Sequence, residues 1–133
     1  MFLEEPCRTD ELDVYARVRE ESGSTPIAGG ENGCSIFEYK QLIDKGCLDI
    51  IQPDVTHAGG IGEVKKAAEY AALNGITVAP HVFRSGASFA AHLHLLSAIF
   101  AIPMQICSSS CCCQSSFSAE HAEFSAAYSL LFR

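Results

Sequence analysis

Four polar side chains that follow short apolar runs are the residues of this sequence best suited to chemistry. They are Glu4, Glu31, Asp54 and His81, and the intervals between them are 27, 23 and 27 residues. Such an interval is about the length of one strand and one covering helix, so the pattern predicts a repeated unit that places a polar group at each strand end. Because the residues that do chemistry in (β/α) folds lie at the C-terminal ends of the strands, the repeat predicts an active site.

The two glutamates are predicted to hold a metal ion. Glu4 and Glu31, at successive strand ends, can approach one another only if their repulsion is neutralised. A hard divalent cation such as Mg²⁺ does this with oxygen ligands. The alternative is that both are surface glutamates or charges at helix N-termini, and their shared place in the repeat favours the metal site.

Asp54 and His81 occupy the next two strand ends and are expected to be neighbours in space. A carboxylate hydrogen-bonded to one ring nitrogen fixes the imidazole tautomer and raises its basicity, which leaves the other nitrogen able to exchange a proton near neutral pH. A lone histidine is more often structural. The pairing favours His81 as a catalytic base or acid, with Asp54 as its partner.

Short apolar strands alternate with helical patterns through the first hundred residues. Helices are expected from about Thr9 to Gly23, from the capping box Ser35–Glu38 to Gly46, from Ile61 to Gly75 and from Ser88 to Phe100, and strands at 26–28, 48–51 and 76–79, besides the one that leads to Glu4. This alternation predicts an α/β fold with a parallel sheet. The last helix is apolar almost all round and is expected to be buried, with His92 and His94 as packing or boundary residues on different faces.

Composition excludes several classes of function. The 133 residues include 9 Lys or Arg against 16 Asp or Glu, a formal net charge of −7, without a basic cluster, so nucleic acid is not expected as a partner. No apolar run approaches the roughly 18 residues of a membrane span, and Met1 opens onto an acidic segment rather than a basic and apolar leader, so neither a membrane location nor secretion is expected. The isolated cysteines Cys7, Cys34 and Cys47 fit free thiols in a reducing cytoplasm.

The sequence changes character after Pro103. Residues 107–116 are a low-complexity run of serine, cysteine and one glutamine, and no strand pattern precedes the stretch behind it. The adjacent cysteines at 111–113 lack the paired Cys-x-x-Cys form of a zinc site and have no second pair. We predict a folded domain at 1–102 and a disordered or aberrant tail at 103–133, with zinc binding by the cysteines as the alternative.

Loop residues near the strand ends are further candidates. His57 and Thr56 lie just past the third strand end and are predicted either to touch substrate or to belong to a solvated loop. Asn32 follows the second glutamate and is a candidate for substrate binding or for supporting the metal ligands. Arg84 is a candidate partner for a substrate carboxylate, with a surface role as the alternative.

Four motifs, in a fixed order, carry a family resemblance. They are Glu-Glu-Pro at 4–6, Ile-Ala-Gly-Gly-Glu-Asn at 27–32, Ile-Ile-Gln-Pro-Asp-Val-Thr-His-Ala-Gly-Gly-Ile at 50–61 and Val-Ala-Pro-His at 78–81. Together they resemble the enolase superfamily, specifically the mandelate racemase and muconate lactonizing enzyme family and its acid-sugar dehydratases. The resemblance covers about residues 1–100.

The resemblance implies a role for each of the four residues. Glu4 and Glu31 would be Mg²⁺ ligands, and Asp54 and His81 the catalytic pair. It implies abstraction of the proton α to a carboxylate, with the metal stabilising the enediolate. Loss of the β-hydroxyl from a sugar acid then gives a 2-keto-3-deoxy product, with His81 as the base or as the acid that helps the hydroxyl leave. Racemase and lactonising reactions share these residues and stay open, and full members of the family commonly form homo-oligomers.

The sequence also departs from the family. Full members carry a capping domain, a lysine base on an earlier strand, a further metal-ligand strand and an acidic eighth strand, whose motifs this sequence lacks. We therefore predict about half of a (β/α) TIM-type barrel, which keeps two of three metal ligands and one of two acid/base groups. Such a chain is expected to be inactive alone, or at most to bind divalent ions weakly. The alternatives are a non-catalytic remnant or interaction fragment with exposed strand edges, and another α/β enzyme that matches by chance.

Overall fold

The computed structural model describes residues 1–83 and 86–99, in which strands and helices alternate strictly. The strands are β1 (Leu3–Glu4), β2 (Ile27–Gly29), β3 (Ile50–Ile51) and β4 (Thr77–Val78), and the helices are α1 (Leu12–Glu21), α2 (Ile36–Asp44), α3 (Ile61–Leu73) and α4 (Gly86–Ala98). Every element expected from the sequence is present, with bounds that differ by a few residues. Arg84 and the tail predicted at 103–133 lie outside the described residues.

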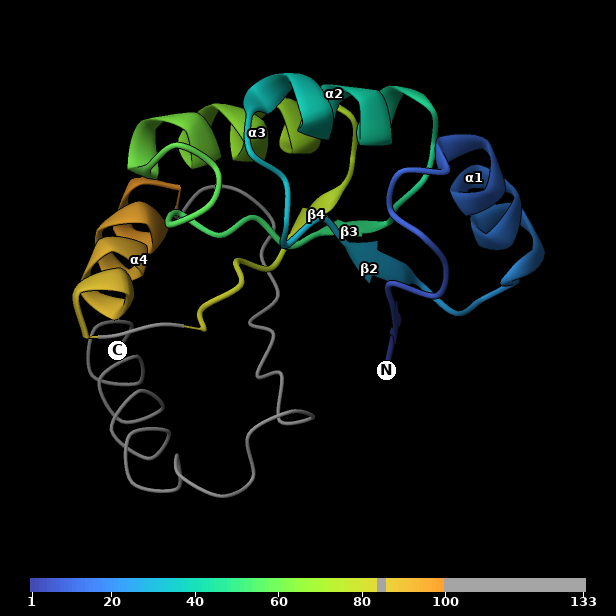
Figure 1. Ribbon diagram of the computed structural model, residues 1–133, viewed down its shortest axis with the longest axis horizontal. Coiled ribbons are helices and arrows are strands. Elements are labelled where there is room, and N and C mark those ends of the chain that lie inside the picture. Colours follow the sequence, from blue (N-terminus) through green and yellow to red (C-terminus); the bar gives the residue numbers. More distant parts are fainter. Residues whose placement is uncertain (84–85, 100–133) are drawn as a thin grey trace.

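The four strands form one parallel sheet whose order, β1-β2-β3-β4, follows the chain. Glu4 lies opposite Ala28, Ala28 opposite Ile50, and Ile50 opposite Thr77. The helices follow one another in an arc along one side of this sheet (Figure 1). Consecutive parallel βα units with their helices outside are the construction of a (β/α) barrel. The predicted α/β class and partial barrel are confirmed.

The core lies between the sheet and the helices because successive strand residues point to opposite faces. Ile27 and Ile51 face the helices, whereas Ala28, Ile50 and Ala79 form a separate small cluster on the other face. Large side chains fill the helix-facing layer: Tyr15, Tyr39, Leu48, Val64, Val78 and Leu95.

Two predicted glycine stops end helices as expected. Gly46 and Gly75 have φ angles of 68° and 72°, the left-handed region that favours glycine. The following amides bond back into the helix: Cys47 N donates to Leu42 O at 2.9 Å, and Ile76 N to the carbonyl oxygen of Ala71, also at 2.9 Å.

Helix α2 begins at the predicted capping box, but the described residues do not form the hydrogen bonds of that motif. Ser35 is the N-cap residue, but its side chain makes no capping hydrogen bond within the described part of the chain. Glu38 instead reaches one residue further back, and its Oε2 accepts a hydrogen bond from Cys34 N at 2.9 Å. The glutamate therefore satisfies an amide ahead of the helix while the serine hydroxyl plays no part.

The sequence predicted a buried last helix, but among the described residues α4 is buried on one side and exposed on another. Helix α4 buries Ser88, His92, Leu95 and Leu96 and exposes His94. Among the described residues it packs chiefly against α3, so only one of its faces is covered. The predicted placement of the two histidines on different faces is confirmed.

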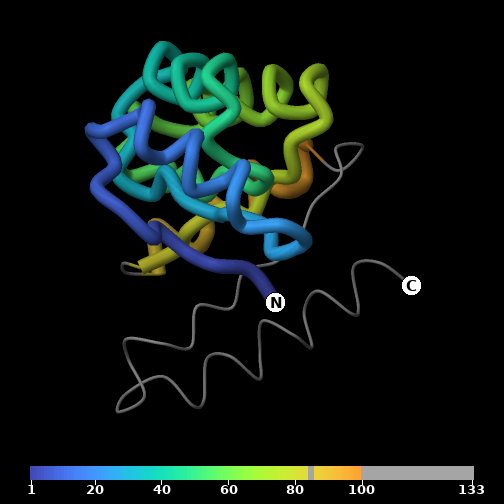
Figure 2. Tube along the Cα trace, turned by 90° about the vertical axis from the view of Figure 1, so that its right-hand side faces the viewer, coloured from blue at the N-terminus to red at the C-terminus, as the bar shows by residue number. Residues whose placement is uncertain are grey.

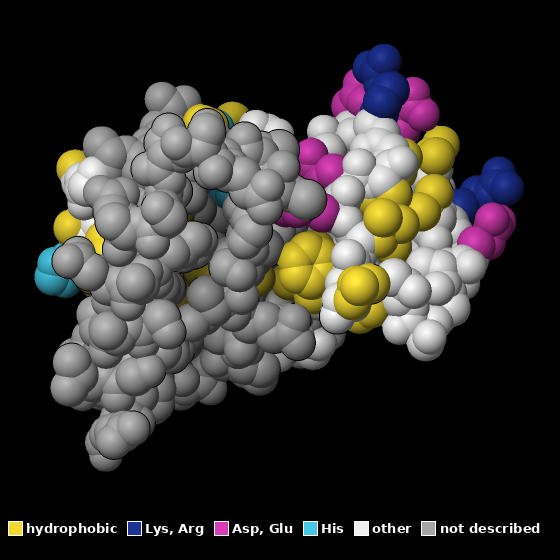
Figure 3. Space-filling model, turned by 90° about the horizontal axis from the view of Figure 1, so that it is seen from below, with side chains coloured by type: hydrophobic (Ala, Val, Ile, Leu, Met, Phe, Trp, Pro, Cys, Tyr) yellow, Lys and Arg dark blue, Asp and Glu magenta, His cyan; other side chains and the backbone are white. Residues whose placement is uncertain are grey.

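The surface of the described part carries the features expected of an incomplete barrel. Among these residues β1 pairs only with β2, and β4 only with β3. The N-terminal segment lies on the side of the molecule opposite α2 and α3 (Figure 2). Apolar side chains gather on the face seen in Figure 3, and the exposed large apolar residues are Met1, Leu3, Val14, Phe37, Ile61, Leu73 and Phe83. None of the described helices combines the length and apolar character needed to cross a bilayer.

Candidate active site at the strand ends

The predicted neighbours Asp54 and His81 lie together. Asp54 stands in the loop after β3 and His81 in the loop after β4, and these two strands are paired. The His81 amide donates to Pro53 O at 3.1 Å, which holds the two loops side by side. His81 Nδ1 lies 3.1 Å from Asp54 Oδ2, so the expected carboxylate–imidazole pair is confirmed as a contact.

The Asp54 carboxylate is fixed by its own loop. Its side chain is 1% exposed, and its Oδ1 accepts hydrogen bonds from Thr56 N at 2.7 Å and from Thr56 Oγ1 at 2.6 Å. Burial raises the pKa of Asp54, but the bonds from Thr56 and His81 outweigh burial and hold the pKa below its usual value. An ionised Asp54 accepts a hydrogen bond from His81 when Nδ1 carries the ring proton, and Nε2 is then the nitrogen that faces away from Asp54.

His81 Nε2 faces a second carboxylate. Glu31 Oε2 lies 3.3 Å from it, and the His81 side chain is 13% exposed while that of Glu31 is 33% exposed. The Phe83 ring stacks on the imidazole, with 6.1 Å between ring centroids. One imidazole therefore lies between acids from two different strand ends, and its Nε2 side is the more open one.

The first glutamate is held across the sheet. Glu4 Oε1 accepts a hydrogen bond of 2.7 Å from Nε2 of the fully buried Gln52. Next to it, Glu5 has a positive φ of 40°, and its Oε1 accepts a hydrogen bond of 3.3 Å from Gly30 N. Burial raises the pKa of Glu5, and the charges of Glu31 and Glu4 raise it further against the lowering effect of the Gly30 bond. Glu5 is therefore repelled by the carboxylates of Glu31 and Glu4.

These acids fit Mg²⁺ in donor type and in charge. Carboxylate oxygens are the ligands that Mg²⁺ prefers, and a divalent cation would relieve the repulsion felt by Glu5. Within residues 1–83 and 86–99, however, no three or more His, Cys, Asp and Glu side chains are grouped so as to hold a metal ion. The described part therefore shows no full ligand set, and the role of Glu4 and Glu31 as ligands of one ion stays a prediction.

The two residues predicted to bind substrate lie in the segments that follow Asp54 and Glu31. His57 is half-buried in the turn after Asp54, and its amide donates to Asp54 O at 3.0 Å. Asn32 is exposed and lines a hollow of about 300 Å³ together with Glu5, Gly30 and residues of α1 and α2. Their contact with a substrate stays a prediction.

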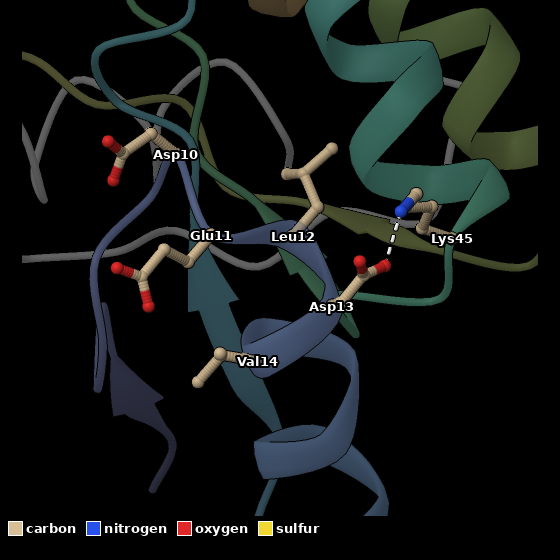
Figure 4. A pocket seen from close by; sticks show the side chains of 6 residues that line it. All are labelled: Asp10, Glu11, Leu12, Asp13, Val14 and Lys45. Atoms are coloured by element: carbon tan, nitrogen blue, oxygen red, sulfur yellow. Dashed lines mark hydrogen bonds and ion pairs between the residues drawn. The ribbon is translucent and has the colours of Figure 1, made fainter.

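A hollow of about 440 Å³ lies elsewhere, at the start of α1. An ion pair joins Asp13 to Lys45, while the carboxylates of Asp10 and Glu11 point away from that lysine (Figure 4). The walls of this hollow are Asp10, Glu11, Leu12, Asp13, Val14 and Lys45, which include none of Glu4, Glu31, Asp54, His81, His57 and Asn32. It is a shallow feature between two surface elements, unrelated to the acids at the strand ends.

Two buried polar residues near the site were not assigned to it from the sequence. Gln52 holds Glu4, and the period of two along β3 would have placed it on the same face as Ile50. His92 of α4 was predicted only as a packing residue, yet its Nε2 lies 3.9 Å from Asp54 Oδ1. A histidine within an apolar helix was the available signal.

Comparisons with known proteins agree with this geometry. A model of the family described as enolase C-terminal domain-like matches residues 1–123. The D-galactarolactone cycloisomerase of Agrobacterium fabrum is 37% identical over 105 residues, which are 79% of this chain and 28% of that protein. The D-galactonate dehydratase of Ralstonia nicotianae is 40% identical over 95 residues, 71% of this chain and 25% of that protein. This chain therefore spans about a quarter of the length of these relatives.

A solved structure gives the same result at the level of the fold. The mandelate racemase/muconate lactonizing enzyme-like protein from Rubrobacter xylanophilus superposes with a TM-score of 0.74 at 37% identity, covering 80% of this chain and 26% of that one. The fold, the order of the motifs and the sequence relatives thus agree. The chain belongs to the enolase superfamily, in its mandelate racemase and muconate lactonizing enzyme family.

Proposed function

We propose that this chain carries part of the active site of a Mg²⁺-dependent acid-sugar dehydratase that abstracts the proton α to a carboxylate. The observation that carries the proposal is the contact of 3.1 Å between His81 Nδ1 and Asp54 Oδ2 at paired strand ends. A sugar acid as substrate is supported by the names of two relatives, a D-galactonate dehydratase and a D-galactarolactone cycloisomerase. Free thiols at Cys7, Cys34 and Cys47 support a cytoplasmic location.

The chain's own residues suit one proton transfer. Asp54 holds Nδ1 of His81 as a donor, so Nε2 takes the α-proton of the substrate as the C–H bond breaks. The electron pair of that bond first forms the enediolate of the substrate carboxylate and then a double bond between the α- and β-carbons. As that double bond forms, the β C–O bond breaks, and the hydroxyl leaves as water with the proton that Nε2 has taken up. The enol that results tautomerises to a 2-keto-3-deoxy acid. In the acid role alone, Nε2 would supply the proton to the leaving hydroxyl without first taking the α-proton.

Glu4 and Glu31 would hold the Mg²⁺ ion. When bound, it would supply positive charge that stabilises the enediolate formed at the substrate carboxylate. Because the described residues offer two carboxylates and one proton-transfer group, we propose that the isolated chain is inactive, or at most binds divalent ions weakly. Racemisation and cycloisomerisation use the same first step, and product analysis separates them from dehydration.

The experiment combines metal binding with chemistry on the purified chain. Mg²⁺ is expected to raise the thermal midpoint of the wild type but not that of Glu31→Gln, since a ligand that binds only the folded form stabilises it. The matched control is Glu20→Gln, an exposed position in the last turn of α1. D-galactonate in ²H₂O then reports α-proton exchange and 2-keto acid formation. Robust turnover would refute the proposed inactivity, and equal Mg²⁺ effects in both variants would refute the metal site.

The second candidate function is that of an interaction fragment. It is favoured by the sheet edges, since within the described residues β1 and β4 each have one strand partner, and by exposed apolar residues such as Leu73 and Phe83. Such edges recruit further strands. Concentration-dependent association in sedimentation, together with no response to Mg²⁺, would favour this candidate over the first.

A further inference from the structure

Helix α4 reaches the catalytic pair through one buried side chain, His92. Its side chain is 1% exposed, and its Nε2 lies 3.4 Å from the backbone N of Val55 and 3.9 Å from Asp54 Oδ1. Its Nδ1 lies 2.8 Å from the carbonyl oxygen of Ser88, one turn earlier in the helix. We propose that His92 is a positioning residue that keeps the Asp54 carboxylate directed at His81. The proposal rests on the proposed function only for the catalytic meaning of that pair.

The partners of His92 determine its tautomer. The Val55 amide is a donor that points at Nε2, so Nε2 is an acceptor without a proton. Nδ1 faces a carbonyl oxygen, which only accepts, so Nδ1 carries the proton. His92 is therefore a neutral imidazole protonated at Nδ1.

This tautomer matters because two acceptors face each other at 3.9 Å. Because His92 Nε2 carries a lone pair and no proton, it cannot donate a hydrogen bond to Asp54 Oδ1. Asp54 Oδ1 accepts its hydrogen bonds from Thr56 instead. With a proton on Nε2, His92 would compete with Thr56 and His81 for the same carboxylate. The Ser88 carbonyl, by holding the proton on Nδ1, removes that competitor.

The second contact of His92 fixes the backbone of the loop. Val55 directly follows Asp54, so the bond from its amide ties the loop after β3 to α4. Thr56 holds Oδ1 of Asp54, and His92 holds the backbone amide of the next residue, Val55. The other carboxylate oxygen, Oδ2, faces His81 Nδ1. The loop is thus positioned from both sides.

The test observes the pair directly, in the full chain without metal or substrate. In ¹⁵N-histidine-labelled protein, long-range ¹H–¹⁵N spectra are expected to show His92 protonated at Nδ1, and His81 with a slowly exchanging Nδ1 proton. His92→Leu is expected to speed exchange of the His81 Nδ1 proton by about tenfold, as for loss of one hydrogen bond. His92→Gln, which keeps an acceptor, is expected to restore slow exchange. His94→Leu on the exposed face of the same helix is the control and should change nothing.

Two results would overturn the proposal. One is a folded His92→Leu variant with unchanged exchange at His81, since a role in packing alone lowers stability without moving this signal. The other is a wild-type His92 protonated at Nε2, which needs no variant and decides the matter even if His92→Leu does not fold. Neither measurement involves Mg²⁺ or turnover, so failure of the proposed function would show as equal Mg²⁺ effects in Glu31→Gln and Glu20→Gln with the histidine signals intact.

Discussion

Replacing Tyr39 by phenylalanine tests how the fold holds the loop that carries Glu31. The Tyr39 side chain is completely buried in α2. Its hydroxyl lies 2.9 Å from Gly30 O and 3.1 Å from Gly33 O, the carbonyls that flank this loop. Burial raises the pKa of Tyr39 well above its usual value, so the hydroxyl is a neutral donor at every pH of interest. Tyr39→Phe is expected to destabilise the chain.

The expected loss of unfolding free energy depends on which hydrogen-bond partners the Gly30 and Gly33 carbonyls keep. The Gly30 carbonyl also accepts a hydrogen bond from Gly33 N at 3.1 Å and so retains a partner. The Gly33 carbonyl is in a buried residue and loses the hydroxyl. An unsatisfied buried acceptor costs about 1–3 kcal/mol. The ring itself stays, and a Cβ added at Gly33 would lie only 2.6 Å from Tyr39 Cζ, so the loop is packed too closely against the ring for water to enter easily.

Urea unfolding measures the effect, with Tyr70→Phe as the matched control. The Tyr70 hydroxyl donates to Asp44 Oδ1 at 2.6 Å on the exposed surface, where such a change alters the unfolding free energy by at most about 0.5 kcal/mol. We expect a lower midpoint for Tyr39→Phe with an unchanged slope. The reasoning fails if the two variants lose the same amount, or if Tyr39→Phe falls within the range of the surface control.

Three further predictions concern stability. Asp49→Asn is expected to cost about 1–2 kcal/mol in urea unfolding, because Asp49 Oδ1 accepts from Arg19 Nε at 2.9 Å and Nη2 at 2.8 Å at a partly exposed site. Gly29→Ala is expected to cost about 1–3 kcal/mol by the same assay, because the new Cβ would lie 2.4 Å from Tyr15 Oη. The pKa of Asp54 is lowered in the folded chain, so its contribution is complete above the unfolded value of 3.8 and is lost as the pH falls below it. An Asp54→Asn variant should therefore show a shallower acid limb, and an unchanged limb would contradict this assignment.

The order and type of the elements could be predicted because their causes are local. Short, mainly apolar segments, such as 48–51 and 76–79, are too short for helices and predict strands. Gly46 and Gly75 end their helices by a backbone conformation that other residues rarely adopt. Strand bounds were less predictable, since pairing across the sheet decides them: β3 is limited to Ile50–Ile51 although the apolar pattern begins at Leu48.

The site was predictable where strand ends alone determine it, and not where side chains reach across elements. The Asp54–His81 contact follows from the pairing of β3 with β4. The bond from Gln52 to Glu4 joins residues 48 apart, and that from Val55 to His92 residues 37 apart. Neither is encoded in a local motif, because each depends on how far the sheet curls and on how a later helix packs against it.

That curl can be argued from the two contacts that skip a strand. Glu4 at the end of β1 is bonded to Gln52 after β3, and Glu31 after β2 faces His81 after β4. Neighbouring strands lie about 4.8 Å apart, so next-neighbour groups on a flat sheet would be about 9.6 Å apart before their side chains are counted. Contacts of 2.7 and 3.3 Å between them require side chains that converge. A barrel produces this convergence because alternate strands contribute side chains to a shared interior layer. The curvature that defines the fold therefore directs the acids and the imidazole toward one another from alternate strands.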